Sequence, residues 1–93
     1  MTIIEAAKRF YAARLRQRES KALLRAYRAE HGGCEYTLDE TLPCFSGGYV
    51  EEVEWCAVCR GSQPLWQEYR TAAARAGAAL RALMLAVAKE ETP

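Results

Sequence analysis

The sequence predicts a mainly α protein: an antiparallel two-helix hairpin whose helices are joined by a cysteine-bearing segment with a short β-strand or hairpin. Three observations lead to this prediction. Residues 2–31 and 63–90 are rich in Ala, Arg, Leu and Glu, which favour helix. All four cysteines lie between these two runs. With 93 residues in one domain, the chain is close to the lower size at which a hydrophobic core suffices, so we expect a metal or a partner to add stability.

The first predicted helix, residues 2–31, has a signal at each end. Thr2 and Glu5 have the spacing of a capping box, in which each side chain accepts a hydrogen bond from the other residue's backbone N–H. His31 is followed by Gly32 and Gly33, and glycine readily takes the left-handed conformation that ends a helix. The apolar residues form two patches on either side of a polar centre, one of Ile3, Ile4, Ala7, Phe10, Tyr11 and Leu15 and one of Ala22, Leu23, Leu24, Ala26 and Tyr27.

The second predicted helix, residues 63–90, starts where Ser62 or Gln63 can cap it and Pro64 can occupy its first turn. Seven residues then recur at alternating steps of three and four, namely Trp66, Tyr69, Ala73, Ala76, Leu80, Leu83 and Val87. This heptad pattern predicts a packing seam. The seam has small residues in its middle, where the first helix is polar, and this match predicts the antiparallel hairpin, with Tyr27 near Trp66.

The segment between the helices predicts a loop, a turn at residues 46–48 and a short strand over residues 49–55. A β-hairpin would pair that strand with residues around Tyr36 or Phe45. Glu51, Glu52 and Glu54 belong to the strand, and we interpret them as a solvated face rather than as ligands of a hard cation.

Four cysteines, Cys34, Cys44, Cys56 and Cys59, follow the pattern C-x9-C-x11-C-x2-C. A C-x2-C turn supplies two thiolates to one ion, and a second pair must come from elsewhere in the chain. We therefore predict one tetrahedral structural Zn²⁺ site with these four ligands, in a zinc-binding segment that spans residues 32–62 and ties both helix ends together. Four thiolates leave no open coordination position, so the site would not be catalytic.

Three alternatives to this ligand set stay open at the sequence level. His31 and Cys34 have the spacing of a knuckle, so His31 could replace Cys44, although a histidine in the last helical turn is commonly just complementary to the helix dipole. Disulfides would form if the protein were exported. A redox role for Cys56 and Cys59 needs a βαβ setting, which this short helical chain does not offer.

Charge and composition set the expected compartment and exclude several functions. The net charge is +5 over residues 1–31, −5 over residues 32–62 and +1 over residues 63–93. The N-terminal sequence has no apolar core of a signal peptide, and no run approaches the roughly 20 apolar residues of a membrane span, so we expect a cytoplasmic protein with no membrane. The single histidine and the absence of a phosphate-binding glycine loop or a Gly-x-Ser-x-Gly motif argue against an enzyme.

Two binding functions are compatible with these features. The apolar residues outside one hairpin seam, such as Leu23, Trp55 and Leu85, predict docking on a protein partner or assembly of a homodimer. Alternatively, the eight basic residues of the first helix would bind nucleic acid, namely Lys8, Arg9, Arg14, Arg16, Arg18, Lys21, Arg25 and Arg28. The acidic middle segment and the near-neutral net charge favour the protein partner.

In these features the chain resembles small proteins encoded by bacteriophages and prophages. Those proteins combine an Ala/Arg-rich helix, a cysteine-containing middle that ends in C-x2-C, and a second helix that opens like Pro64-Leu65-Trp66. The resemblance covers most of the chain, and Cys56 and Cys59 are its sharpest motif. Most such proteins have no known role, and some inhibit or regulate host systems by stoichiometric binding. The resemblance thus implies a binding protein that acts in a host cytoplasm.

Overall fold

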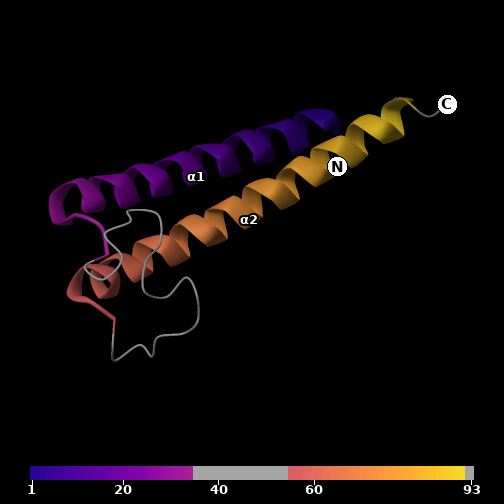
Figure 1. Cartoon of the computed structure of the whole chain (residues 1–93). Coiled ribbons are helices and arrows are strands. Elements are labelled where there is room, and N and C mark those ends of the chain that lie inside the picture. The colour runs from indigo at the N-terminus through magenta and orange to yellow at the C-terminus, as the bar shows by residue number, and fades with distance from the viewer. Residues whose placement is uncertain (35–54, 92–93) are drawn as a thin grey trace. The chain divides into compact units, whose positions relative to one another are not determined.

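The computed structural model describes residues 1–34 and 55–91, and in these ranges the protein is mainly α. Its two helices are α1, Ile3–His31, and α2, Ala57–Glu91 (Figure 1). The prediction of two helices as the main elements is confirmed, and α1 runs without a break through the polar stretch 16–21. The predicted strand over residues 49–55, apart from Trp55, lies outside the described residues, and so does Cys44.

Both ends of α1 have the predicted caps. The Glu5 backbone N–H donates to Thr2 Oγ1 at 3.1 Å, and the Ala6 N–H donates to the Thr2 carbonyl at 3.0 Å. At the other end Gly32 has a φ of 84°, and its N–H donates to the Arg28 carbonyl at 2.7 Å. A single bond of this type, from a left-handed glycine to the carbonyl four residues earlier, closes the helix. The direction of the chain toward Cys34 is therefore set by Gly32.

The prediction that the second helix starts at residue 63 is wrong, because α2 begins at Ala57 and Pro64 lies inside it. The helix start is set by Cys56, whose carbonyl accepts from the Arg60 N–H at 3.0 Å and whose Sγ accepts from the Cys59 N–H at 3.4 Å. Cys56 thus fills the position in which Ser, Thr or Asp usually caps a helix. Pro64 has no N–H to donate, which leaves the helix short of one backbone bond at this point.

Contacts along the chain divide it into two compact units. The helix-pair unit comprises Met1–Lys21 and Glu68–Pro93, and the cysteine unit comprises Ala22–Gln67. Each unit contains a part of α1 and a part of α2.

The buried face of α1 follows a heptad pattern that its apolar residues do not reveal. Eight of the ten buried or half-buried residues of α1 recur at steps of three and four: Ile3, Ala6, Phe10, Ala13, Gln17, Ser20, Leu24 and Tyr27. Ser20 is buried and Gln17 is half-buried, so polar side chains occupy the centre of the seam. The stretch 16–21, which is polar on all sides, thus still contributes Gln17 and Ser20 to the buried face. Short or amphipathic polar side chains can pack there without interrupting the helix.

The seam of α2 is displaced by one residue from the predicted one at three of the seven predicted positions. Its most buried residues are Ala72, Ala76 and Ala86, with Ala79 and Leu83 half-buried between them. Ala76 and Leu83 belong to the predicted seam, but Leu80 is 41% exposed and Val87 is 36% exposed. The helix packs its alanines inward because small side chains let two helix backbones approach closely, and the larger apolar side chains remain on the neighbouring face.

The expectation that no segment approaches a membrane span also needs correction. By length and composition alone α2 would be able to cross a membrane, since an 18-residue window of it has a mean hydropathy of 1.3 and is 17% buried. Between residues 71 and 88 only Arg75 and Arg81 are charged. A count of uninterrupted apolar residues missed this window because those two arginines divide it, although the many alanines between them keep the average high.

Candidate metal centre

Three cysteines meet in the cysteine unit. The Sγ atoms of Cys34, Cys56 and Cys59 lie within 4.8 Å of one another. All three residues are at most 4% exposed, and none of them is in a disulfide. Trp55 and Val58 pack against this cluster. Three buried sulfur atoms that converge without a covalent link are a candidate metal centre, and the prediction that these three cysteines come together is confirmed.

The local structure at Cys56 and Cys59 explains how two of the thiols are positioned. Because Cys56 caps α2 and Cys59 lies in its first turn, the helix itself sets the spacing of their sulfur atoms. The Cys59 N–H donates to Cys56 Sγ at 3.4 Å and fixes the direction of that side chain. Both residues lie at the N-terminus of a helix, so both sulfur atoms are held on the same helical turn. This arrangement suits two thiolate ligands of one cation.

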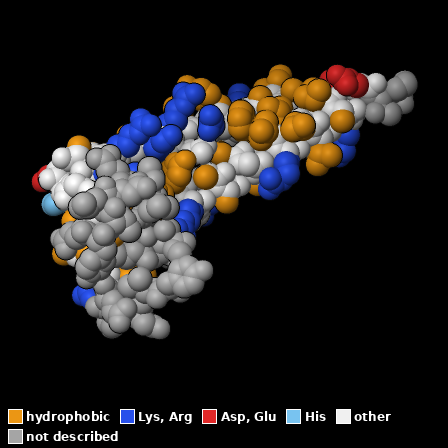
Figure 2. Space-filling view, in the orientation of Figure 1, with side chains coloured by type: hydrophobic (Ala, Val, Ile, Leu, Met, Phe, Trp, Pro, Cys, Tyr) orange, Lys and Arg blue, Asp and Glu red, His pale blue; other side chains and the backbone are white. Residues whose placement is uncertain are grey.

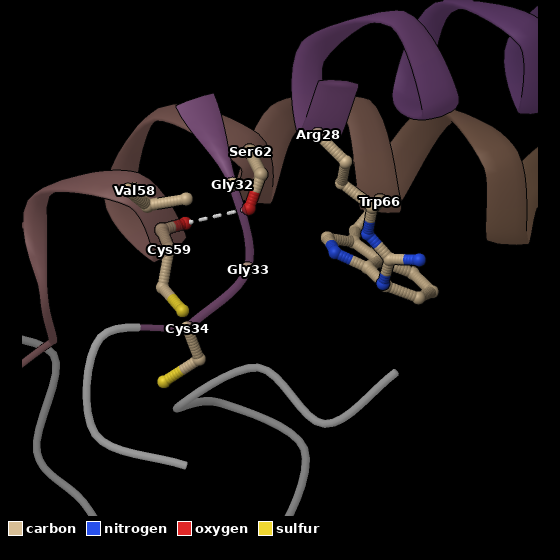
Figure 3. A pocket seen from close by; sticks show the side chains of 8 residues that line it. All are labelled: Arg28, Gly32, Gly33, Cys34, Val58, Cys59, Ser62 and Trp66. Atoms are coloured by element: carbon tan, nitrogen blue, oxygen red, sulfur yellow. Dashed lines mark hydrogen bonds between the residues drawn. The ribbon is translucent and has the colours of Figure 1, made fainter. Parts of the chain in front are cut away.

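The third thiol reaches the cluster through the turn that ends α1. Gly32 and Gly33 lie between α1 and Cys34, and they line a small cavity together with Cys59, Ser62 and Trp66 (Figure 3). This cavity measures about 10 Å³, which is at most the space of a single water molecule. The described residues that line this cavity are therefore closely packed around Cys34 and Cys59.

Ser62 and Arg28 hold the walls of this cavity. The Ser62 hydroxyl, which is buried, donates to the Cys59 carbonyl at 3.2 Å. The Arg28 guanidinium lies over the Trp66 ring, with its Cζ 4.6 Å from the ring centroid (Figure 3). A cation–π contact of this kind stabilises by about 0.5–1 kcal/mol near a surface. The contact of Arg28 with Trp66 was not predicted from the sequence, and the predicted proximity of Tyr27 to Trp66 stays a prediction.

Tyr27 packs against Gly61. A Cβ atom built on Gly61 would overlap the Tyr27 hydroxyl and part of its ring, so the two residues are in close contact. The other side of the Tyr27 environment contains His31, whose ring centroid is 4.3 Å from that of Tyr27. Gly61 is therefore a point of close approach between the last turns of α1 and the first turns of α2.

The geometry of the three thiols fits a thiophilic cation. Zn–S bonds of about 2.3 Å at tetrahedral angles place sulfur atoms about 3.8 Å apart, so the observed sulfur positions need little movement to bind one ion. Thiolates select zinc and other soft or borderline metals over Mg²⁺ or Ca²⁺, which prefer oxygen ligands. What the structure itself establishes is that these three cysteines could hold a metal ion.

The fourth predicted ligand, Cys44, and its alternative, His31, have different outcomes. Cys44 lies outside the described residues, so its place in the ligand set stays a prediction. His31 does not belong to the described group of potential ligands around the three thiols. Its side chain is 45% exposed, lies beside Tyr27, and places Nε2 3.8 Å from a carboxylate oxygen of Glu30. This position favours the interpretation of His31 as a side chain that complements the helix C-terminus.

Three features of the centre were missed by sequence reasoning. The capping role of Cys56 could have been predicted. If the Cys56–Cys59 knuckle opens the helix, the Cys59 N–H lies three residues after Cys56, where an N-cap side chain finds its donor. The contacts of Arg28 with Trp66 and of Tyr27 with Gly61 depend on the tertiary arrangement, and no local sequence pattern predicts them. Comparison of this chain with protein-family models, with curated proteins and with solved structures gave no match.

Proposed function

We propose that this protein is a non-enzymatic helical binding protein, in which a structural Zn²⁺ ion ties the end of α1 to the start of α2. The observation that carries the proposal is the convergence of three buried thiols from two separate parts of the chain. Cys34 comes from the turn after α1, and Cys56 and Cys59 come from the start of α2. A metal ion at this point would fix the two helix ends to each other and orient the helices as an antiparallel hairpin.

We assign the fourth coordination position to Cys44. It is the one other cysteine of the chain, and a fourth thiolate completes the closed tetrahedron of a structural zinc site. In the proposal its binding also joins the acidic middle segment to the same ion. Because the ligands come from three places in the sequence, the metal closes two loops, and the free energy of metal binding becomes free energy of folding.

The binding role is supported by the exposed apolar surface of the two helices. Among the described residues nine large hydrophobic side chains are exposed, namely Met1, Ile4, Tyr11, Leu15, Leu23, Leu80, Met84, Leu85 and Val87. Hydrophobic side chains gather over the part of the molecule that contains the C-terminal half of α2 (Figure 2). Small soluble proteins rarely leave so much contiguous apolar surface in water, so the surface favours docking on another protein. The resemblance to phage-encoded proteins supports an inhibitor or regulator of a host system.

Affinity capture tests the protein partner. We expect the zinc-loaded chain to retain one protein from its native cells at a fixed ratio, in 0.5 M salt and after nuclease treatment. At this salt concentration the Debye length is about 4 Å, so charge–charge attraction is screened while apolar contacts remain intact. A Leu85→Arg variant should lose that protein, since Leu85 is 65% exposed and the added charge lies on the apolar surface. Arg18→Glu, a charge reversal on exposed α1, serves as the matched control and should retain it.

Nucleic-acid binding is the second candidate, and the exposure of the α1 cations favours it. Seven of the eight basic residues of α1 are exposed, namely Lys8, Arg9, Arg14, Arg16, Arg18, Lys21 and Arg25. A surface of this kind binds phosphates with an affinity that falls steeply with added salt. Capture that disappears with nuclease, with 0.5 M salt and with Arg18→Glu, but survives Leu85→Arg, would replace the protein partner by nucleic acid.

A further inference from the structure

The helix-pair unit has a second apolar face on α2 that the described chain leaves partly open. The open stripe consists of Ala73, Gly77, Leu80, Met84 and Val87, which recur at steps of four and three. Its large members are 41%, 62% and 36% exposed, in sequence order. Each residue of the stripe immediately follows a residue of the buried seam, so the stripe is turned about 100° around the helix from the seam. Helices in a four-helix bundle pack against two neighbours at about this angle.

Two copies of the open stripe are complementary in shape when they pack antiparallel. Its N-terminal half contains the small residues Ala73 and Gly77, and its C-terminal half contains the large residues Leu80, Met84 and Val87. In an antiparallel pair of α2 helices, Leu80 lies over the partner's Gly77 and Met84 lies over the partner's Ala73. A parallel pair would instead set small residues against small ones and large against large, which leaves a gap at one end.

A groove is present at the small half of the stripe. It measures about 360 Å³ and is lined by Phe10 and Gln17 of α1 and by Ala73, Gly77 and Leu80 of α2, among others. This is more than twice the roughly 150 Å³ of an apolar cavity that can hold benzene, so large aliphatic side chains fit. A Cβ atom at Gly77 would meet only Arg81 Nη1, at 3.6 Å, among the described neighbours. The space over Gly77 is thus open to a side chain of another molecule.

The charges around the groove do not oppose an apolar occupant. Arg14 also lines it, and its Nη1 donates to Gln17 Oε1 at 2.7 Å, which holds the guanidinium against α1. On the outer flank of the stripe, the antiparallel arrangement places Arg81 beside the partner's Ala74, so that this arginine meets a small neutral residue. An acidic occupant is therefore not needed to neutralise the groove.

We propose that a second copy of this chain docks antiparallel on the open stripe, with Leu80 and Met84 of each copy seated in the groove beside the other copy's Gly77 and Ala73. The inference rests on the proposed function, because it names a second copy of the chain as one partner of α2, on a stripe that lies beside Leu85. The contact is isologous, so each substitution acts twice in the dimer.

The oligomeric state of the zinc-loaded full chain tests this proposal, by light scattering during size-exclusion chromatography and by sedimentation equilibrium. We expect a dimer for the wild type and a monomer for Met84→Arg, with dimer affinity lowered about 100-fold or more because two charges enter the apolar interface. Leu85→Arg is the matched control: Leu85 is 65% exposed against 62% for Met84, but it lies off the stripe, and the variant should remain dimeric. Helicity and metal content confirm that each variant folds.

A size swap tests the antiparallel register. Gly77→Leu sets two large side chains against each other at the partner's Leu80, so we expect dimer affinity to fall by on the order of tenfold or more. Leucine is also a better helix former than glycine, so this loss cannot come from a weaker helix. The double variant Gly77→Leu with Leu80→Ala restores a large residue over a small one and should recover most of the affinity.

Four results would overturn the proposal. They are a wild-type chain that stays monomeric up to about 100 μM, a dimer that survives Met84→Arg, a dimer lost equally with Leu85→Arg, and a dimer strengthened by Gly77→Leu. A monomer that binds phosphatidylcholine vesicles would assign the apolar face of α2 to a lipid surface instead. If the chain is monomeric but still retains its zinc and its captured protein, the dimer fails while the proposed function stands.

Discussion

Cys59→Ser is expected to remove the metal and unfold the cysteine unit. Cys59 is 1% exposed, and its Sγ lies within 4.8 Å of both other thiols, so Cys59→Ser removes one of the three thiols that the described residues bring together. Structural zinc sites contribute about 10–16 kcal/mol of apparent binding free energy, as much as the whole stability of a typical small domain. We expect zinc content to fall from one equivalent to nearly none, with loss of helix in the first turns of α2 and the last turns of α1, as measured by elemental analysis and by circular dichroism.

Ala57→Ser provides the control for this experiment. Ala57 is exposed, lies in the same helical turn, and also receives a hydroxyl in place of a small group, but it offers no thiolate. The variant should keep its zinc and its helicity. A Cys59→Ser protein that folds, melts and binds metal like the wild type would show that the three thiols do not form a metal centre.

Gly61→Ala is expected to destabilise the protein by about 1–2 kcal/mol, although alanine in a helix is usually better than glycine by about 1 kcal/mol. The reason is the contact with Tyr27, whose hydroxyl and ring occupy the space of the new methyl group. To make room, Tyr27 must leave its position beside His31. Urea unfolding of the zinc-loaded protein measures the change.

The same substitution in a Tyr27→Ala background separates the two effects. Without the ring, the methyl group has free space, and Gly61→Ala should then stabilise by up to about 1 kcal/mol relative to Tyr27→Ala alone. The change of sign between the two backgrounds measures the coupling between Gly61 and Tyr27. Equal effects in both backgrounds would mean that Tyr27 does not pack on Gly61 in solution.

The sequence was sufficient for those features that a local pattern specifies. Thr2 with Glu5 and His31 with Gly32 determine hydrogen bonds within one turn of helix, so both ends of α1 could be predicted. Clustering of the cysteines likewise follows from chemistry, because buried thiols without a disulfide are best explained by a shared ligand. The start of α2 was misplaced because Pro64 is a strong local signal, whereas a sulfur atom that caps a helix is an uncommon one.

Packing between helices could not be predicted from apolar periodicity alone. Gln17 and Ser20 occupy buried positions of α1, and a search for apolar residues passes over them. In α2 two neighbouring faces both have the heptad spacing, and the predicted seam combined residues of the two. Large apolar side chains such as Leu80 and Val87 were predicted to be core residues. The alanines are buried in their place, because small side chains let two helix backbones approach closely. The larger residues then form the open stripe.

The metal content of the purified protein tests the central claim most directly. We predict one zinc ion per chain, bound by thiolates, as shown by elemental analysis and by the sulfur-to-metal charge-transfer absorption that appears after Co²⁺ replaces Zn²⁺. Removal of the ion with a chelator should lower the melting temperature and the helicity, and added zinc should restore both, because metal binding and folding are coupled. A protein that is purified under reducing conditions without metal, and whose melting is unchanged by chelator or zinc, would contradict the metal centre and with it the account given above.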